Sequence, residues 1–339
     1  MRIISIVSCS LLAVVFVSIC MAANEVQIKS GNNRIGNIAR VIGGEPAKAN
    51  EFTSTVLLEI GSTRYDSQMC TGSLIAPNVV LTAAHCAFLD ETVQFNASDF
   101  RVAFGHNTTT YMTTSSSYGV RKVIVHPKFD MIELDGDIAI VILEKDVNST
   151  IAEPIRLYSG EYYTDTPIRA AGFGMTDPND YDSLPTQLMA VNLAIGSDAL
   201  CTRNTNSYSH EYFICTDGTA GKDTCSGDSG GPLATPVDHD SGTALIGLTS
   251  YGTSSVYNPY GLCAQSGSSG YYTRIAPYIP WIASSAGLDA KSLSITNNTE
   301  IKHNEDNTTY SGAFSAKSAS SITIGLALAA VLSVATLFL

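Results

Sequence analysis

Residues 227–232 read Gly-Asp-Ser-Gly-Gly-Pro, and this string does most to decide the fold and the function of the chain. Its serine, Ser229, stands between glycines, which let a backbone turn sharply and bring peptide N–H groups close to a bound carbonyl. A serine hydroxyl is a weak nucleophile until a base takes its proton and hydrogen-bond donors stabilise the resulting oxyanion. Alone, the string also fits a glycine-rich surface turn, so its meaning depends on a base and a carboxylate elsewhere.

Two strings upstream supply those groups. Residues 81–86, Leu-Thr-Ala-Ala-His-Cys, offer His85 as the base, and residues 137–140, Asp-Ile-Ala-Ile, place Asp137 at the head of an apolar segment. Asp135 is a rival carboxylate two residues earlier. We favour Asp137 because the apolar run begins directly after it. The order His, Asp, Ser is that of chymotrypsin-like enzymes and differs from the orders in subtilisins and α/β-hydrolases.

The pattern of apolar segments indicates an all-β domain over residues 41–288. Short apolar runs such as 55–60, 120–125 and 138–143 are separated by turn residues, which is typical of a barrel or a sandwich. One helix is expected near residues 275–286, with Gly287 as its stop. Hydrophobic residues make up 45% of the 339 residues, enough for a sizeable core, and the net charge of −12 argues against nucleic acid as a partner.

Both ends of the chain carry the marks of processing and export. Arg2 is followed by an apolar run over residues 3–19 and then by small residues, so we predict a signal peptide at 1–22, with a membrane-spanning helix as the alternative. Residues 23–40 are a short polar stretch that we interpret as an activation propeptide. Residues 289–321 are rich in Ser, Thr and Asn and predict a stalk, and residues 322–339 form an uncharged tail.

Cysteines and sequons agree with an exported chain. Six cysteines remain after loss of the signal peptide, and they allow fifteen disulfide pairings: Cys70, Cys86, Cys201, Cys215, Cys225 and Cys263. The candidate glycosylation sites are Asn96, Asn107, Asn148, Asn297 and Asn307.

Taken together, the strings resemble the chymotrypsin family of serine proteases, and closely its trypsin branch, over residues 40–287. Further matching strings begin at Val41, Cys70, His126, Leu184, Ser250 and Tyr272. The resemblance implies two six-stranded antiparallel β-barrels with a C-terminal helix and a site between the barrels. Ser229 is then the nucleophile, His85 the base and Asp137 the group that orients it, while the N–H groups of Gly227 and Ser229 form the oxyanion hole.

The resemblance also implies disulfides, an activation switch and a specificity. The implied pairs are Cys70–Cys86, Cys201–Cys215 and Cys225–Cys263. Cleavage after Arg40 would free the α-amino group of Val41 to pair with the Asp228 carboxylate. Asp223, six residues before Ser229, takes the place of the acid at the floor of the pocket for an Arg or Lys side chain. The other implied substrate-binding residues are Ser250, Gly252 and Gly270.

Some features depart from the family pattern. Residues 253–262 make a longer connection than usual, and Tyr251 and Phe173 stand where the family commonly has Trp. The stretch 105–118 has no Asp or Glu, so we predict no calcium site there, and no metal or cofactor elsewhere.

The expected partners are polypeptides with Arg or Lys at P1, protein protease inhibitors, and an activating protease or a second copy of the chain. A catalytically silent homologue that binds without cutting is the alternative, and the complete set of triad residues disfavours it. We predict a GPI signal over a spanning helix at the C-terminus, with Ser311 as the attachment site, which places the protein on the extracellular face of the membrane.

Overall fold

The computed structural model describes residues 41–61, 67–105, 117–177, 180, 183–205, 207–219, 221–237, 242–253 and 263–296, all within the compact unit that ends at Asn298. Several predicted sites lie outside these described residues: Arg40, Asn107, Asn297, Asn307 and Ser311. The predicted signal peptide, propeptide and C-terminal tail lie outside them as well. None of the helices within the described ranges is long and apolar enough to cross a membrane.

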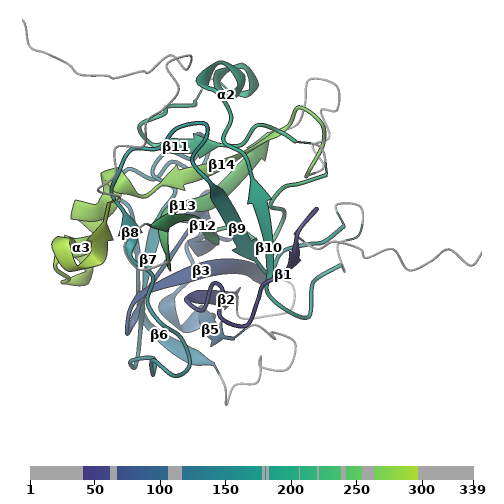
Figure 1. Cartoon of the computed structure of the whole chain (residues 1–339). Coiled ribbons are helices and arrows are strands. Elements are labelled where there is room, and N and C mark those ends of the chain that lie inside the picture. Colours follow the sequence, from purple (N-terminus) through teal and green to yellow (C-terminus); the bar gives the residue numbers. More distant parts are fainter. Residues whose placement is uncertain are drawn as a thin grey trace, which may run out of the picture. The chain divides into compact units, whose positions relative to one another are not determined.

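Six strands in the first half close into an antiparallel barrel, in the order β2-β3-β4-β7-β6-β5 (Figure 1). They are β2 (Thr55–Ile60), β3 (Gln68–Ala76), β4 (Val79–Thr82), β5 (Phe100–Phe104), β6 (Tyr118–Val125) and β7 (Ala139–Leu143). Side chains of a strand alternate between its two faces. In β2, Val56, Leu58 and Ile60 accordingly fill one hydrophobic cluster with Val80 of β4, whereas Leu57 packs into a second cluster shared with the other half of the chain.

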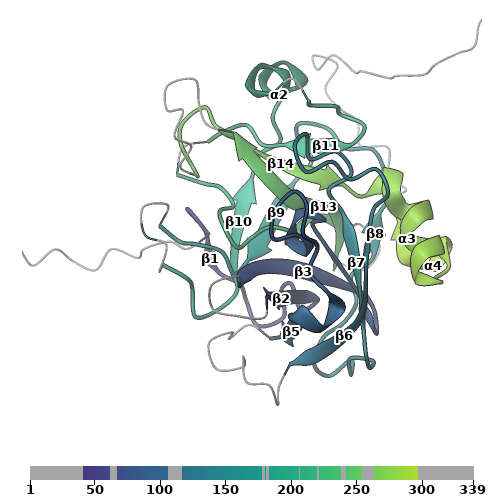
Figure 2. The same ribbon diagram turned by 180° about the vertical axis from the view of Figure 1, so that it is seen from behind.

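The second half forms a larger sheet in which six strands follow the order β10-β9-β12-β13-β14-β11 (Figure 2). They are β9 (Ile168–Gly172), β10 (Met189–Leu193), β11 (Phe213–Cys215), β12 (Pro232–Val237), β13 (Gly242–Thr253) and β14 (Ser269–Arg274). An isolated bridge between Ile195 and Thr216 joins the ends of this path, beyond β10 and β11. The predicted fold is therefore confirmed: the first half is a closed six-stranded barrel, and the second half is a sheet whose path of six strands has its ends joined by this bridge within the described residues.

Short elements extend this second sheet and link the two halves. β1 (Glu45–Pro46) pairs with β10, and β8 (Leu157–Tyr158) pairs with β13. The remaining early elements are the 3-10 helices η1 (His85–Ala87) and η2 (Ala97–Asp99) and the helix α2 (Asp198–Asn204).

The C-terminal helix forms where the sequence predicts it. It consists of the 3-10 turn η3 (Ala276–Tyr278) and α3 (Ile279–Ala286). Gly287 ends the helix at φ 69°, a left-handed conformation that glycine adopts without steric cost.

The folded domain continues past residue 288, where we expected the stalk to begin. Asp289 accepts a hydrogen bond from the N–H of Ser292 at 3.0 Å and so caps the short helix α4 (Ala290–Leu293). The strand β15 (Ser294–Ile295) then pairs in parallel with β8, and Leu293 is buried in the core. The pairing of β15 with β8 and the burial of Leu293 therefore hold residues 289–296 on the domain, although the sequence around them is mostly polar.

Candidate active site

The turn that carries Ser229 lies immediately before β12 and is held against the first barrel. Thr71 of β3 donates its N–H to the carbonyl of Ser229 and its Oγ1 to the carbonyl of Gly227, both at 2.8 Å. Gly230 has φ 76°, and a Cβ there would come within 2.0 Å of Oγ1 of Thr82. Only glycine allows this close approach, which brings Ser229 next to the strand end that precedes His85.

His85 and Asp137 meet in the geometry that their predicted roles require. Oδ2 of Asp137 lies 2.8 Å from Nδ1 of His85, and Oδ1 accepts the backbone N–H of His85 at 2.9 Å. Ser250 also donates its hydroxyl to Oδ2. Asp137 is fully buried, whereas Asp135 is exposed. The structure therefore brings Asp137, and not its rival, to the histidine.

Each partner shifts the pKa of the other. Burial by itself would lower the pKa of the His85 imidazole, but the Asp137 carboxylate outweighs burial and raises that pKa above 6.5. Burial by itself would raise the pKa of Asp137, but the attraction and hydrogen bond of His85 and the Ser250 hydroxyl hold it below its usual value. The pair therefore favours an ionised carboxylate that stabilises a protonated imidazole.

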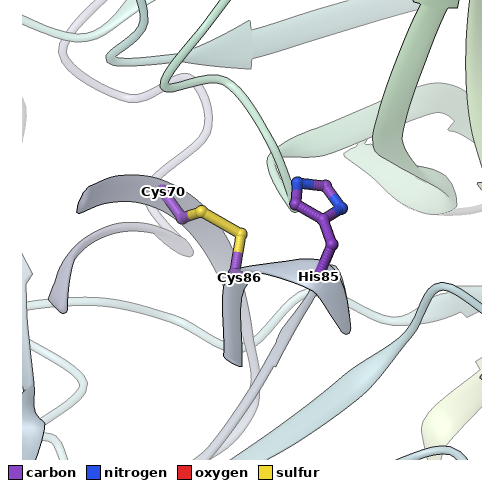
Figure 3. A group of neighbouring side chains, drawn as sticks. All are labelled: Cys70, His85 and Cys86. Carbon is purple, nitrogen blue, oxygen red and sulfur yellow. A yellow bond between two sulfur atoms is a disulfide. The ribbon is translucent and has the colours of Figure 1, made fainter. Parts of the chain in front are cut away.

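A disulfide holds His85 in place. Cys86 is the next residue in η1, and it is joined to Cys70 of β3 with an S–S distance of 1.99 Å (Figure 3). The ligand atoms of Cys70, His85 and Cys86 lie within 4.8 Å of one another, but the two sulfurs are bonded to each other and offer no thiolate to a metal. Because Thr71 follows Cys70, neighbouring residues of β3 hold both the histidine and the serine turn.

Asp223 and Ser229 both line a cavity of about 260 Å³. The lining also includes the three other predicted substrate-binding residues, Ser250, Gly252 and Gly270. The Asp223 carboxylate accepts the N–H of Thr224 at 2.9 Å and that of Ala264 at 3.1 Å. Burial raises its pKa to about 6 against the effect of these bonds. Among the described residues no cationic side chain pairs with it.

Asp228 is fully buried beneath the Ser229 turn. Its carboxylate accepts the N–H groups of Gly174 and Cys225, each at 2.8 Å. Burial raises its pKa to about 7, although the two hydrogen bonds oppose the shift, and no cationic side chain in the described ranges reaches it. Val41 is also fully buried, and the carbonyl of the following residue, Ile42, accepts the N–H of Asp223 at 3.1 Å.

The remaining predicted site residues fall into three groups. The disulfides Cys201–Cys215 and Cys225–Cys263 form as the resemblance implied. The sequon residues Asn96 and Asn148 are exposed on the surface. The two residues that replace Trp behave differently: Phe173 is buried, whereas Tyr251 stacks on Tyr271 with ring centroids 4.7 Å apart and borders the Asp223 cavity.

Sequence reasoning missed several residues that hold the site. Thr71 and Thr82 stand inside the quoted strings, next to Cys70 and shortly before His85, so position along the chain was the available signal. Thr273 donates its hydroxyl to the carbonyl of Asp137 at 2.9 Å. Ala264 acts through its backbone N–H, for which its residue type gives no signal.

The N–H groups of Gly227 and Ser229 are the predicted oxyanion donors. Gly227 has φ 97°, and within the described part of the chain neither N–H has an acceptor. An N–H without a protein acceptor is available to a bound carbonyl oxygen.

Comparison with known proteins identifies the family. The family model described as Trypsin matches residues 41–282. Trypsin alpha of Drosophila erecta is 31% identical over 254 residues, 73% of this chain and 88% of that protein. Chymotrypsin-like elastase family member 1 of Canis lupus familiaris is 31% identical over 252 residues, 72% of this chain and 91% of that protein.

A third relative has a similar identity and coverage. The protein named Trypsin from Saccharopolyspora erythraea is 29% identical over 239 residues, 70% of this chain and 94% of that protein. These relatives include two proteins named as trypsins and one named as a chymotrypsin-like elastase family member. The chain belongs to the trypsin family of serine proteases and is a peptide hydrolase.

Proposed function

We propose that this protein is an endopeptidase that cuts polypeptides after Arg and Lys through an acyl-enzyme. The observation that carries the proposal is the buried Asp223 carboxylate, which lines the same cavity as Ser229 and has no cationic partner among the described residues. A buried carboxylate without a counter-ion is costly, and a cationic P1 side chain removes that cost through charge-assisted hydrogen bonds. Arg is preferred to Lys because its planar fork pairs with both carboxylate oxygens.

The chemistry proceeds in two halves. Oγ of Ser229 attacks the scissile carbonyl carbon while Nε2 of His85 takes the hydroxyl proton, and the N–H groups of Gly227 and Ser229 stabilise the oxyanion. The protonated His85 then gives its proton to the leaving amine, and the C–N bond breaks to leave an ester on Ser229. Water then attacks the ester carbonyl carbon while Nε2 of His85 takes one of its protons. The bond between that carbon and Oγ of Ser229 breaks, His85 returns the proton to Oγ, and the acid leaves. Asp137 holds the imidazole tautomer throughout.

The same family membership and the geometry around Asp228 support a zymogen. Cleavage after Arg40 creates an ammonium at Val41, whose side chain is already buried in the second barrel. Pairing of that ammonium with Asp228 removes an isolated buried charge beneath the Ser229 turn. Because Arg is also the preferred P1 residue, slow self-activation follows from the proposed specificity.

We further propose that the protein is exported from the cell. The N-terminal signal pattern, three disulfides and exposed sequons at Asn96 and Asn148 support a secreted glycoprotein, because disulfides persist in oxidising compartments. The tail pattern supports a GPI anchor at Ser311 on the extracellular face of the plasma membrane.

Replacement of the pocket acid tests the specificity. In the activated enzyme, Asp223→Ser removes one partner of a buried ion pair, a loss of about 3–5 kcal/mol. We expect kcat/KM on Arg substrates to fall by about two to four orders of magnitude. Labelling of Ser229 by an uncharged fluorophosphonate should stay largely intact, because the reagent does not need Asp223.

The exposed acid Glu91 offers a matched control, since Glu91→Ser removes one negative charge away from the cavity. That variant should cut Arg substrates like the wild type. A wild-type preference for Phe, Leu or Ala at P1 would contradict the proposed specificity, as would an Asp223→Ser variant with undiminished cleavage after Arg.

A further inference from the structure

A five-residue turn lies directly behind the pocket acid. Residues 264–268 run from Ala264, whose N–H binds the Asp223 carboxylate at 3.1 Å, to Ser268, which precedes β14. Within the turn, the N–H and hydroxyl of Ser268 both bind the carbonyl of Gln265, at 3.1 and 2.6 Å. The position of the Ala264 N–H, and with it that of the carboxylate, therefore depends on how this turn is held.

Asn204, the last residue of α2, reaches the far end of the same turn. Its Nδ2 donates to the carbonyl of Gly267 and to Oγ of Ser269, both at 3.1 Å. Ser269 is the first residue of β14 and is only 1% exposed. One amide thus binds the turn and the strand on which the turn ends.

Helix α2 is itself fixed by contacts that do not involve the turn. The Cys201–Cys215 disulfide ties it to β11, and the Tyr271 hydroxyl donates to the carbonyl of Cys201 at 2.8 Å. Ser197 caps its N-terminus through the N–H of Leu200. The helix is a rigid support, and the Asn204 amide transmits its position to the turn.

The start of β14 borders the pocket directly. Ser269 and Gly270 pair with Thr253 and Gly252 of β13, and Gly252 and Gly270 both line the Asp223 cavity. A Cβ on Gly270 would come within 2.9 Å of Oδ1 of Asp223, which shows how closely this strand approaches the carboxylate. A small shift of the strand would therefore change the space that a P1 side chain enters.

We infer that Asn204 is a positioning residue for the P1 pocket, which clamps the 264–268 turn and the start of β14 to helix α2. The inference rests on the proposed function of Asp223 as the P1 acid. Asn204 lies outside the lining of the cavity and acts through the Ala264 N–H and Gly270.

Asn204→Ala removes two hydrogen bonds, one of them to a buried hydroxyl. Each is worth about a factor of five in an equilibrium constant, so we expect the Kd of benzamidine, a compact aromatic cation, to rise about 10-fold or more. KM for Arg substrates should rise by a similar factor with little change in kcat. The rate of Ser229 labelling by an uncharged fluorophosphonate should stay within about twofold of the wild type.

Two comparisons separate a clamp from a general loss of stability. Thr202→Ala, at an exposed position of the same helix, should leave Kd unchanged. Adding Ser269→Ala to Asn204→Ala should weaken binding less than the two single effects multiplied, because the two residues share a bond.

Hydrogen exchange gives a readout that does not depend on P1 specificity. In the Ser229→Ala chain, Asn204→Ala should speed amide exchange in a peptide covering residues 263–270 and leave α2 itself protected. Faster exchange across the whole domain, or unchanged exchange with unchanged Kd, would overturn the clamp. A wild type that binds no benzamidine would instead overturn the role of Asp223, while exchange at 263–270 would still decide on the clamp.

Discussion

Two buried carboxylates near the catalytic serine differ in what surrounds them. Asp223 opens onto the cavity and has a pKa of about 6, raised by burial. Asp228 is closed off from solvent and has a pKa of about 7, again raised by burial and further by the charge of Asp223. Among the described residues neither carboxylate has a cationic partner. In our proposal a P1 side chain pairs with Asp223, and the Val41 ammonium pairs with Asp228.

The pKa of Asp223 predicts how ligand binding depends on pH. Benzamidine should bind tightly above pH 6, where the carboxylate is ionised, and its Kd should rise by about tenfold for each pH unit below that, because protons compete for the site. Calorimetric titration of the activated Ser229→Ala protein measures this. Asp223→Asn should bind weakly with no such dependence, and a wild-type Kd that is flat from pH 7 to pH 4.5 would contradict the assignment.

The pKa of Asp228 predicts a pH-dependent difference between the uncut and cut chains. In the uncut chain its folded pKa of about 7 exceeds the unfolded value, so this group makes the chain less stable as the pH rises from about 4 to 7. After cutting, the Val41 ammonium lowers that pKa and the loss disappears.

Thermal unfolding of two proteins tests this difference. Arg40→Gln with Ser229→Ala stays uncut, whereas Ser229→Ala alone is cut by added trypsin. The Tm of the cut protein minus that of the uncut protein should grow between pH 5 and pH 8. Parallel Tm curves over that range would show that Asp228 is not the carboxylate that pairs on activation.

At the scale of single elements, β3 contacts the active-site segments, whereas the C-terminal segment, residues 289–296, packs against the domain. Cys70 of β3 is bonded to Cys86 of η1, and Thr71 of β3 binds the Ser229 turn, so one strand contacts the segments that carry the base and the nucleophile. Residues 289–296 lie beyond the family match, which ends at residue 282. They add a parallel strand to β8 and bury Leu293.

This added segment should stabilise the domain without serving catalysis. Leu293→Ala leaves a cavity in the core and should cost about 2–5 kcal/mol of unfolding free energy, seen as a lower Tm. Lys291→Ala, at an exposed position of the same helix, should unfold like the wild type. Fluorophosphonate labelling of the folded Leu293→Ala protein should match the wild type at a temperature well below its Tm. An unchanged Tm would mean that α4 and β15 dock only loosely.

At the scale of the whole molecule, the site exists only where the two barrels meet. His85 and Asp137 come from the first barrel, whereas Ser229, Asp223 and Ser250 come from the second. In our proposal the tail, residues 322–339, is the signal that attaches the domain carrying this site to the outer face of the membrane.

The tail sequence predicts release by a lipase. Residues 311–313 are small, residues 314–321 form a short spacer, and the last 18 residues carry no charge, which is the plan of a GPI signal. Treatment of expressing cells with a phosphatidylinositol-specific phospholipase should release the enzyme into the medium. A chain ending at residue 321 should be secreted without treatment. Retention of the full chain, with its C-terminal peptide intact by mass spectrometry, would instead identify a spanning helix.

The sequence by itself determined the fold class and the chemical groups of this protein. Short alternating strands are a local property of side-chain spacing, and the strings around His85, Asp137 and Ser229 are contiguous, so both can be found without the fold. The apolar run after Asp137 also singled out, over Asp135, the carboxylate that contacts His85. The three disulfide pairs needed the family resemblance, because spacing alone left fifteen possibilities.

Only the tertiary structure decided how these groups are held. Thr71, Ala264 and Asn204 act through backbone atoms or an amide on partners 41 to 158 residues away. The folding of residues 289–296 likewise depends on the pairing of β15 with β8, a strand that lies much earlier in the sequence. A hydrogen bond between distant segments depends on where the chain places both ends, and neither residue type nor local spacing encodes that placement.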